Sequence, residues 1–209
     1  TAIWLDRFPG LKRNGEHVQL RGTPDDGVIT LDGLRLLGEH NRDNAAAAIL
    51  LCICAGVSRS AIRTAAMSPL PHRLEPVHVS QGVTWINDSK ATNVDAALVG
   101  IQSITEPVIV LLGGAAKAGS KYERLNQVLH TNTRAVLCFG EAGPNIANQI
   151  DACPVEIVST MMEAILRAAK RAQIGDSILL SPACASFDEF NNFEERGESF
   201  ATLAREAKP

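Results

Sequence analysis

The 209-residue sequence has no excess of basic residues and no apolar run long enough to cross a membrane. Its formal net charge of -3 argues against nucleic acid or an anionic membrane surface as a partner. The longest apolar run, residues 45–55, is far shorter than the roughly 20 residues that a membrane-spanning helix needs, and no basic leader with a cleavage site is seen. We therefore expect a cytoplasmic protein with no nucleic-acid partner and no membrane insertion.

Paired cysteines, metal-ligand motifs and a phosphate loop are missing as well. The five cysteines are an odd number, include no C-x-x-C pair and lie mostly in apolar segments, which predicts reduced core thiols rather than disulfides or a zinc site. Cys184 has no histidine nearby in the sequence, which argues against a nucleophile. The G-x-x-x-x-G-K-[ST] motif is absent, and no set of metal ligands has an accepted spacing.

The first 69 residues predict the end of a sheet followed by two helices. Short alternating segments separated by glycine and aspartate turns predict strands, and because the chain starts at Thr1 without methionine we expect this sheet to have begun earlier in a longer protein. The apolar run after residue 44 predicts a buried helix closed by Gly56, and a short helix is expected over 58–67. Pro69 and Pro71 then place a domain boundary near residue 70.

From residue 70 onward, strands and helices alternate regularly. The sequence predicts a hairpin over 74–88 and a helix from about Thr92. Further strands are expected over 107–114, 135–140, 154–158 and 177–181, and further helices over 122–130, 144–149 and 160–173 and from Ser186. This alternation predicts an α/β, Rossmann-like, mostly parallel sheet with helices on both faces. Ligands of such sheets bind at the carboxyl ends of the strands.

The segment "NDSKATN", residues 87–93, follows the second strand of the hairpin. Its loop leads into a helix and contains Lys90, so phosphate or carboxylate is the natural guest, and Asp88 suits a ribose diol. The alternative is structural, with Thr92 and Asp95 forming a capping box and Asp88 closing an Asx turn. The spacing leaves both interpretations open.

Three other segments could hold a ligand. The loop after residue 112 has two glycines and Lys117, but it resembles a phosphate cradle only weakly, and a solvated lysine is the alternative. Small residues up to Ser186 would let the backbone approach a ligand, while Ser186 with Glu189 predicts a capping box and the nearby phenylalanines predict the core face of the last helix. Asn41 and Asn44 share one helix face and could read a base edge, although helix capping is the alternative.

Together, the segments "GEHNRDNAAAA", "LPHRLE", "NDSKATN", "LLGG…K" and "LLSPACASFDEFNNFEERGESF" resemble the Mur ligase family, and the last one resembles its glutamate-adding branch. Members of this family have an N-terminal domain for the UDP-sugar, a central ATPase domain and a C-terminal Rossmann-like domain. The resemblance implies that residues 1–69 are the tail of the central domain and residues 70–209 the whole C-terminal domain. Because the P-loop, magnesium ligands, modified lysine and UDP-sugar pocket have no counterpart here, we expect the chain alone to be inactive.

The resemblance also implies a reaction and its participants. ATP, with Mg2+ held mainly outside this chain, would activate UDP-N-acetylmuramoyl-L-alanine as an acyl phosphate, and D-glutamate would attack it, in peptidoglycan precursor synthesis by a monomeric enzyme. Similarity places at the nucleotide Asn41, Asn44, Arg73, Asp88 and Lys90, of which Lys90 and Arg73 would be catalytic. It places at D-glutamate Thr92, Lys117, Ser186, Phe187 and Phe193. The alternatives are a folylpolyglutamate synthase-like ligase and a free-standing nucleotide-binding or regulatory module.

Overall fold

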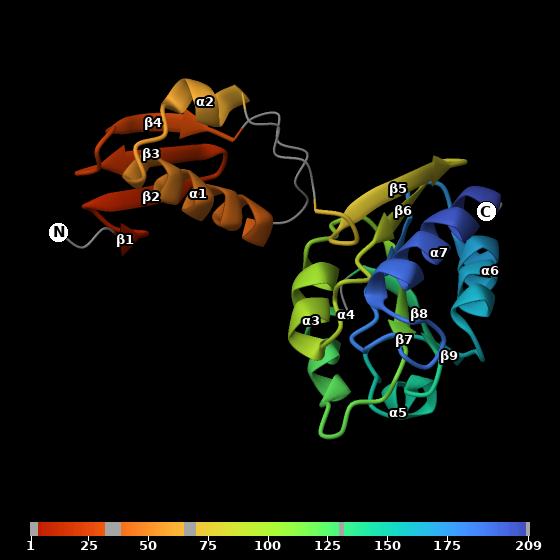
Figure 1. Ribbon diagram of the computed structural model, residues 1–209. Coiled ribbons are helices and arrows are strands. Elements are labelled where there is room, and N and C mark those ends of the chain that lie inside the picture. The colour runs from red at the N-terminus through yellow and green to blue at the C-terminus, as the bar shows by residue number, and fades with distance from the viewer. Residues whose placement is uncertain (1–3, 32–38, 65–69, 130–131, 208–209) are drawn as a thin grey trace. The chain divides into compact units, whose positions relative to one another are not determined.

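The computed structural model describes residues 4–31, 39–64, 70–129 and 132–207, with the side chains of residues 40, 63 and 64 also outside the description. The chain divides into two compact units, Thr1–Pro69 and Leu70–Pro209. Each unit has its own sheet, four-stranded in the first and six-stranded in the second (Figure 1).

The first unit packs one helix against a small sheet. Its strands β1 (Trp4–Leu5), β2 (Gly10–Asn14), β3 (His17–Arg21) and β4 (Gly27–Thr30) lie in chain order, and all but the parallel β1–β2 pair are antiparallel. Helices α1 (Glu39–Cys54) and α2 (Arg59–Thr64) follow. The core joins buried residues of the sheet, such as Val18 and Leu20, to Ile49 and Ile53 of α1. The predicted strands and buried helix are confirmed, while residues 65–67 of the second predicted helix lie outside the described residues.

The second unit is built on a sheet of order β5-β6-β10-β7-β8-β9, in which only β5 is antiparallel to its neighbour. The strands are β5 (Glu75–Ser80), β6 (Val83–Asn87), β7 (Val108–Gly113), β8 (Thr133–Phe139), β9 (Val155–Ile157) and β10 (Ser177–Leu180). All six residues of β7 are buried, as expected for a central parallel strand covered on both faces. The predicted Rossmann-like sheet is confirmed.

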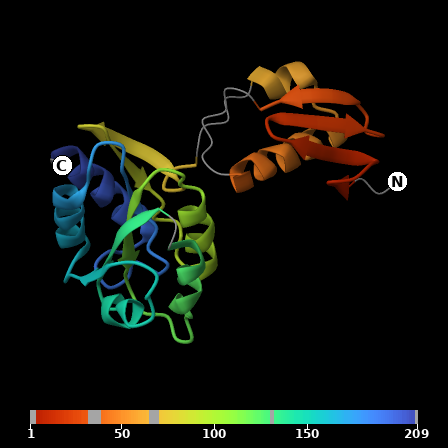
Figure 2. The same cartoon turned by 180° about the vertical axis from the view of Figure 1, so that it is seen from behind.

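Helices cover both faces of this sheet. They are α3 (Val94–Gln102), the 3-10 helix η1 (Tyr122–Leu125), α4 (Asn126–Leu129), α5 (Gly143–Ala147), α6 (Met161–Arg171) and α7 (Phe193–Glu206). Helices α6 and α7 lie on one side and α3 and α4 on the other, as both views show (Figures 1 and 2). On the α6/α7 side, Trp85, Leu111 and Leu137 pack with Ile165 and Phe200 in one buried cluster.

Asparagine caps set two helix starts, so the predicted start at Ser186 is wrong and the Thr92 capping box does not form. Helix α3 begins at Val94, because the side chain of Asn93, and not that of Thr92, accepts a hydrogen bond from Ala96 N (2.9 Å). The last helix begins at Phe193 rather than Ser186, since Asn192 accepts from Glu195 N (2.7 Å) and caps it. Both asparagines stand directly before their helices, where this residue type is strongly favoured.

The predicted Ser186–Glu189 capping box does not form. The carbonyl oxygen of Ser186 accepts from the backbone N–H groups of Glu189 and Phe190, which makes a turn. The Glu189 carboxylate instead accepts from Met161 N (3.1 Å) and so caps helix α6. Phe187 is consequently not on the core face of a helix but lies in the turn, 72% exposed.

Candidate functional site at the carboxyl edge of the sheet

The loops after β6, β7 and β10 meet at the carboxyl edge of the parallel sheet. Strand β10 lies between β6 and β7, so the chain that follows it contacts both neighbouring loops. Asp88 N donates to Leu180 O (2.8 Å) on one side, and Ala115 N donates to Ala185 O (2.9 Å) on the other. The loops at the carboxyl ends of these strands, where ligands of such sheets bind, therefore meet in the fold.

The Asp88 carboxyl points into the protein. One oxygen, Oδ2, accepts from Ser181 Oγ (2.8 Å), and Oδ1 accepts from Leu74 N (3.2 Å), while only 4% of the residue is exposed. Burial raises the pKa of Asp88 to about 7, although the hydrogen bonds from Ser181 and Leu74 and the charge of Arg73 act in the opposite direction. A Cβ on Gly100 of α3 would lie 2.4 Å from Oδ2, so the helix can approach this carboxyl only with glycine there.

Two cations accompany this carboxyl, because Arg73 acts on it in the fold and Lys90 follows it by two residues in the sequence. Arg73 is half-buried, and its positive charge acts on Asp88. Lys90 is exposed, and its Nζ lies 5.2 Å from the ring centroid of Phe193 at the start of α7. The half-buried Thr92 follows two residues after Lys90, so the loop after β6 presents cationic and hydroxyl groups suited to an anionic ligand.

His72 belongs to this site, although the sequence analysis did not select it. Asn87 donates through Nδ2 to Gly197 O (3.2 Å) and accepts from Ser89 N (3.1 Å), and these backbone partners fix the orientation of its amide. The same Nδ2 lies 3.0 Å from His72 Nδ1, so Nδ1 accepts and the proton of a neutral ring is on Nε2. The sequence feature that could have pointed to His72 is its position directly before the candidate residue Arg73.

Two glycines shape the loop after β7. A Cβ on Gly113 (φ +152°) would lie 2.1 Å from Phe139 O, and one on Gly114 (φ +132°) 2.2 Å from Ala185 O. Only glycine permits these close approaches. Further along, Ala116 N donates to the carboxylate of Glu141 (3.3 Å), and Lys117 is exposed. The loop that presents Lys117 is thus held against the segment after β8 by Glu141, and against the segment that leads to Ser186 by the Ala115–Ala185 hydrogen bond.

The segment after β10 combines buried and exposed side chains. Ser186 is buried, whereas the adjacent Phe187 is exposed, and Asp188 Oδ2 accepts from Glu141 N (3.1 Å). Cys184 is buried with its sulfur 3.1 Å from Tyr122 Oη, and burial raises the pKa of its thiol. A thiol with a raised pKa is a poor nucleophile, which agrees with the structural role predicted for this residue.

Arg196 of α7 is a second residue that the sequence analysis missed. It is fully buried beneath these loops, although it carries a charge. Its spacing in the sequence could have indicated that it is buried, because Arg196, Phe200 and Ala204 stand at i, i+4 and i+8 on the buried face of one helix. A charged residue within such an apolar stripe has a specific set of partners or a specific task.

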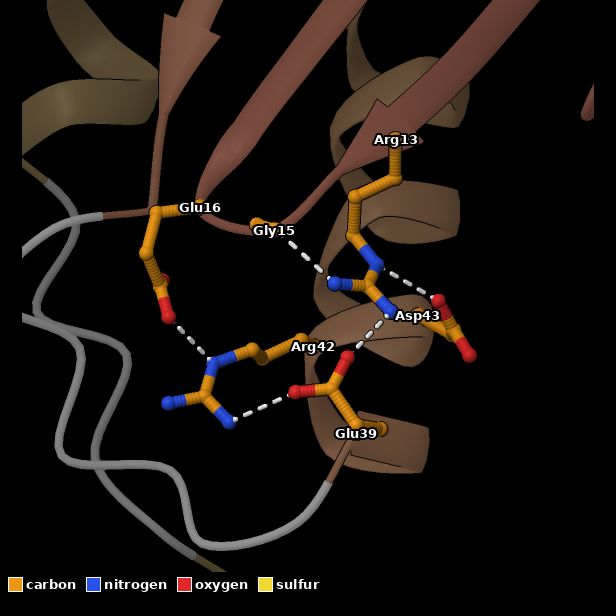
Figure 3. Close-up of polar contacts among 6 residues, drawn as sticks. All are labelled: Arg13, Gly15, Glu16, Glu39, Arg42 and Asp43. Carbon is orange, nitrogen blue, oxygen red and sulfur yellow. Dashed lines mark hydrogen bonds and ion pairs between the residues drawn. The ribbon is translucent and has the colours of Figure 1, made fainter.

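The remaining candidates, Asn41 and Asn44, lie in helix α1 of the first unit. Ion pairs attach the start of this helix to the β2–β3 turn (Figure 3). Arg13 contacts Glu39 (2.7 Å) and Asp43 (2.6 Å), and Arg42 contacts Glu16 (2.6 Å) and Glu39 (3.2 Å). Asn41 is half-buried and Asn44 exposed, one helical turn apart. The network therefore fixes the helical turn that presents both amides.

Two other kinds of feature are absent from the described part of the chain. No group of three or more His, Cys, Asp or Glu side chains is arranged to hold a metal ion among these residues. No helix within the same residues is both long and apolar enough to span a bilayer.

The chain is similar to known proteins. Residues 72–184 match the family described as "Mur ligase, glutamate ligase domain". The chain belongs to the Mur ligase family. Curated relatives named UDP-N-acetylmuramoylalanine--D-glutamate ligase include that of Myxococcus xanthus, 42% identical over 83% of this chain and 39% of its own length. The Synechocystis relative is 44% identical over 83% of this chain and 40% of its own length, so the chain spans about two fifths of these relatives.

Solved structures show the same fold at low sequence identity. The bifunctional folylpolyglutamate synthase/dihydrofolate synthase from Yersinia pestis aligns with a TM-score of 0.63 at 20% identity, covering 93% of this chain and 45% of that one. The MurF ligase from Thermotoga maritima, in complex with ADP, aligns with a TM-score of 0.60 at 16% identity, covering 94% and 47%. At these identities the likeness concerns the fold alone.

Proposed function

We propose that the chain is part of an ATP-dependent ligase that joins D-glutamate to UDP-N-acetylmuramoyl-L-alanine in peptidoglycan precursor synthesis. Relatives that carry this activity in their names are 42% and 44% identical over 83% of the chain. The observation that carries the proposal is the Ala115–Ala185 hydrogen bond, which brings the loops of Lys117 and Ser186 together at one edge of the sheet. A small dicarboxylate needs a binding group for each of its two carboxylates, and both groups must lie at the same edge of the sheet.

We assign one part of the site to ATP and another part to D-glutamate. ATP would phosphorylate the carboxylate of UDP-N-acetylmuramoyl-L-alanine, the amine of D-glutamate would attack the acyl phosphate, and phosphate would leave as the amide forms. Arg73 and Lys90 would neutralise phosphate charge, because catalysis of phosphoryl transfer rests mainly on positioning and charge neutralisation. A divalent metal, which we expect to be Mg2+ held mainly by residues outside this chain, would add positive charge at the phosphates.

Candidate nucleotide-binding residues occur in each unit. Asn41 and Asn44 present amide groups that suit the edge of adenine. Asp88 is proposed at the ribose, but its oxygens are engaged by Ser181 and Leu74, so contact with a ribose hydroxyl requires the carboxyl to leave these partners or share them. Arg73 is half-buried and Lys90 exposed, and we place both at the phosphates.

D-Glutamate would bind where the three loops meet. Lys117 supplies an exposed cation, and the turn at Ser186 replaces the helix N-terminus that the sequence predicted there. We place the remaining contacts of the amino acid at Thr92, Phe187 and Phe193. The exposed ring of Phe187 would then be covered by substrate.

The domain assignment is part of the same proposal. Residues 1–69 would be the C-terminal part of the central ATP-binding domain, and residues 70–209 the C-terminal Rossmann-like domain. The enzyme would be a cytoplasmic monomer that serves the cell wall, and thereby cell shape and division. Because the 209 residues contain no P-loop motif, we expect the chain by itself to bind or position substrates without completing the reaction.

Phosphate release tests the proposal. The 209-residue chain and the longer protein that includes the P-loop are each supplied with ATP, Mg2+ and UDP-N-acetylmuramoyl-L-alanine, with either D-glutamate or L-glutamate. We expect release only from the longer protein and only with D-glutamate. Ligation by the 209-residue chain, or no ligation by the longer protein, contradicts the proposal.

A second candidate is a ligase that extends folates with glutamate, because the Yersinia pestis synthase shares this fold and the fold alone does not choose between the two activities. Reduced folate and L-glutamate in the same assay distinguish the two activities. The segment "SPACASFDEF", on which the resemblance to the D-glutamate branch rests, favours the first candidate. Tight binding of ATP by the 209-residue chain in calorimetry, without ligation by any longer protein, would instead favour a free-standing nucleotide-binding module.

A further inference from the structure

The guanidinium of Arg196 lies beneath the meeting point of the three loops. Its Nε donates to Ser89 Oγ (2.9 Å) and Nη2 to Ser89 O (2.8 Å), both in the loop after β6. Nη1 and Nη2 donate to Cys184 O (3.1 Å each), and Nη1 also donates to Ala185 O (3.1 Å), in the segment after β10. One side chain therefore joins two loops that are about a hundred residues apart in sequence.

The third loop packs against the same group. A Cβ on Gly114, in the loop after β7, would lie 3.0 Å from Nη1 of Arg196. The serine partner is also engaged on its other side, because Ser89 Oγ donates to Phe193 O (2.8 Å) at the start of α7. Arg196 and its partners Ser89, Cys184 and Ala185 thus form a single buried cluster, which we call the Arg196 clamp.

The guanidinium has no carboxylate within ion-pair distance among the described residues, although the charges of Asp188 and Glu189 act on it from further away. All acceptors of the guanidinium are neutral, and none of the ion pairs formed by the described residues includes Arg196. Burial lowers the pKa of Arg196 to about 10, so the group is still protonated at neutral pH. A buried cation without a carboxylate partner costs stability, which raises the question of what it is retained for.

We propose that Arg196 is a positioning residue, which holds the loops of Lys90, Lys117 and Ser186 in register and adds a positive potential beneath an anionic amino-acid substrate. The inference rests on the proposed function for the identity of that substrate. The geometric part stands on the five hydrogen bonds of the clamp alone. Arg196 itself is fully buried, so it acts through the loops and does not touch the substrate.

Amide hydrogen exchange of the 209-residue chain tests the clamp without any substrate. In Arg196→Met we expect the amides of Lys90 and Ala115 to exchange at least about tenfold faster, since each lost hydrogen bond to a charged group is worth roughly a factor of 10 to 100. Arg134→Met is the matched control. It removes the Arg134–Asp176 ion pair (2.7 Å) near the amino ends of β8 and β10, at the opposite edge of the same sheet.

Two further variants guard against simple unfolding. Arg196→Lys keeps the charge but cannot reach all the acceptors with one ammonium, so it should restore loop protection only in part. Ser89→Ala removes one partner and leaves the charge in place, and it should loosen the loop after β6 more than the loop after β7. The clamp is overturned if the loop amides of Arg196→Met exchange as slowly as those of wild type. It is also overturned if Arg134→Met, at the same loss of melting temperature, shows the same faster loop exchange as Arg196→Met.

Kinetics of the longer protein test the positioning role. We expect Arg196→Met to raise the KM for D-glutamate at least about tenfold, because the dianion depends on both loops and on the potential. The KM for ATP should rise less, because only the loop of Lys90 is proposed to serve the nucleotide. Arg134→Met should move neither constant. Loosened loops with an unchanged D-glutamate KM overturn the positioning role. A wild-type protein without ligase activity counts against the proposed function, while loop exchange still decides whether the clamp exists.

Discussion

Burial decides what single polar side chains of this site can do. Asp88 follows a strand in a pattern typical of a ligand-binding loop, yet its carboxyl faces Ser181 and Leu74 N inside the protein. Lys117 and Phe187 lie in neighbouring loops and are exposed. The same edge of the sheet therefore holds groups that stabilise the loops and groups that are available to a ligand, and substitutions separate the two kinds.

Asp88→Asn should change how stability depends on pH. The pKa of this carboxyl rises from its ordinary 3.8 to about 7 on folding, so the folded state holds the proton more tightly and stability falls as the pH rises through this window. Asparagine preserves the shape and can accept from Leu74 N while donating to Ser181 Oγ. The variant should match wild type near pH 4 and exceed it by up to about 4 kcal/mol above pH 7.

Denaturant unfolding of both proteins between pH 4 and pH 8 measures this difference. Two parallel stability profiles would show that the Asp88 carboxyl is not held neutral by its surroundings.

If Asp88 also contacts ribose in the longer enzyme, the variant should lose about 10- to 100-fold in the specificity constant for ATP, the usual value of a charged hydrogen bond.

Lys117→Ala tests the grip on D-glutamate. Loss of a charged contact to a carboxylate costs roughly 1.5 to 3 kcal/mol, so the KM for D-glutamate should rise at least about tenfold in the longer enzyme while that for ATP is nearly kept. Lys117→Arg should rescue only in part, because a planar guanidinium does not replace a point charge. Lys121→Ala, at another exposed lysine of the same loop, is the control. Steady-state kinetics with an unchanged D-glutamate KM would remove Lys117 from the site.

Helix caps set the loop geometry of this fold. Helices α3 and α7 both begin later than the sequence predicted, and each delay lengthens a loop at the carboxyl edge. Thr92 and Ser186 are consequently not bound up in capping their own helices. The asparagines that cap in their place lie next to the proposed site, so stability and ligand binding depend on adjacent residues.

Asn93→Ala should destabilise the second unit, whereas Thr92→Ala should not. The Asn93 side chain accepts from Ala96 N, and removal of such a cap costs about 0.5 to 2 kcal/mol. Thermal unfolding followed by circular dichroism compares the two variants with wild type. A larger loss in Thr92→Ala than in Asn93→Ala would mean that the predicted capping box forms in solution after all.

Each unit of the chain has its own hydrophobic core. The larger cluster lies within the second unit and the cluster of Val18, Ile49 and their neighbours within the first. The central strand of the second unit is buried on both faces, and each fully buried aliphatic side chain contributes roughly 1.5 to 3 kcal/mol. The second unit therefore contains what a domain needs to fold alone.

A protein of residues 70–209 should fold without the first unit. We expect a cooperative thermal transition and a far-ultraviolet spectrum with helix and strand signals, because the described core contacts of this unit are internal to it. Differential scanning calorimetry and circular dichroism of the shortened chain measure this. A broad, non-cooperative transition would mean that the unit depends on residues 1–69.

The sequence by itself determined the local and periodic features of this protein. Alternating apolar strands and helices fix a parallel sheet, because each pattern can bury its apolar side in only one way, and the strand ends then mark the site. The family motifs located the candidate residues along the chain, and the structure brings the loops of Lys90, Lys117 and Ser186 to one edge.

Only the tertiary structure decided which side chains face inward and which groups compete for the same partner. Helix starts depended on which of two candidate residues caps the helix. Asn192 and Ser186 have nearly equal capping propensities, and Asn93 is only somewhat better than Thr92. The inward turn of Asp88 and the contacts of Arg196 depend on residues about a hundred positions away. Hydrogen bonds of this range are set by how the strands are ordered in the sheet, and local sequence patterns carry no record of them.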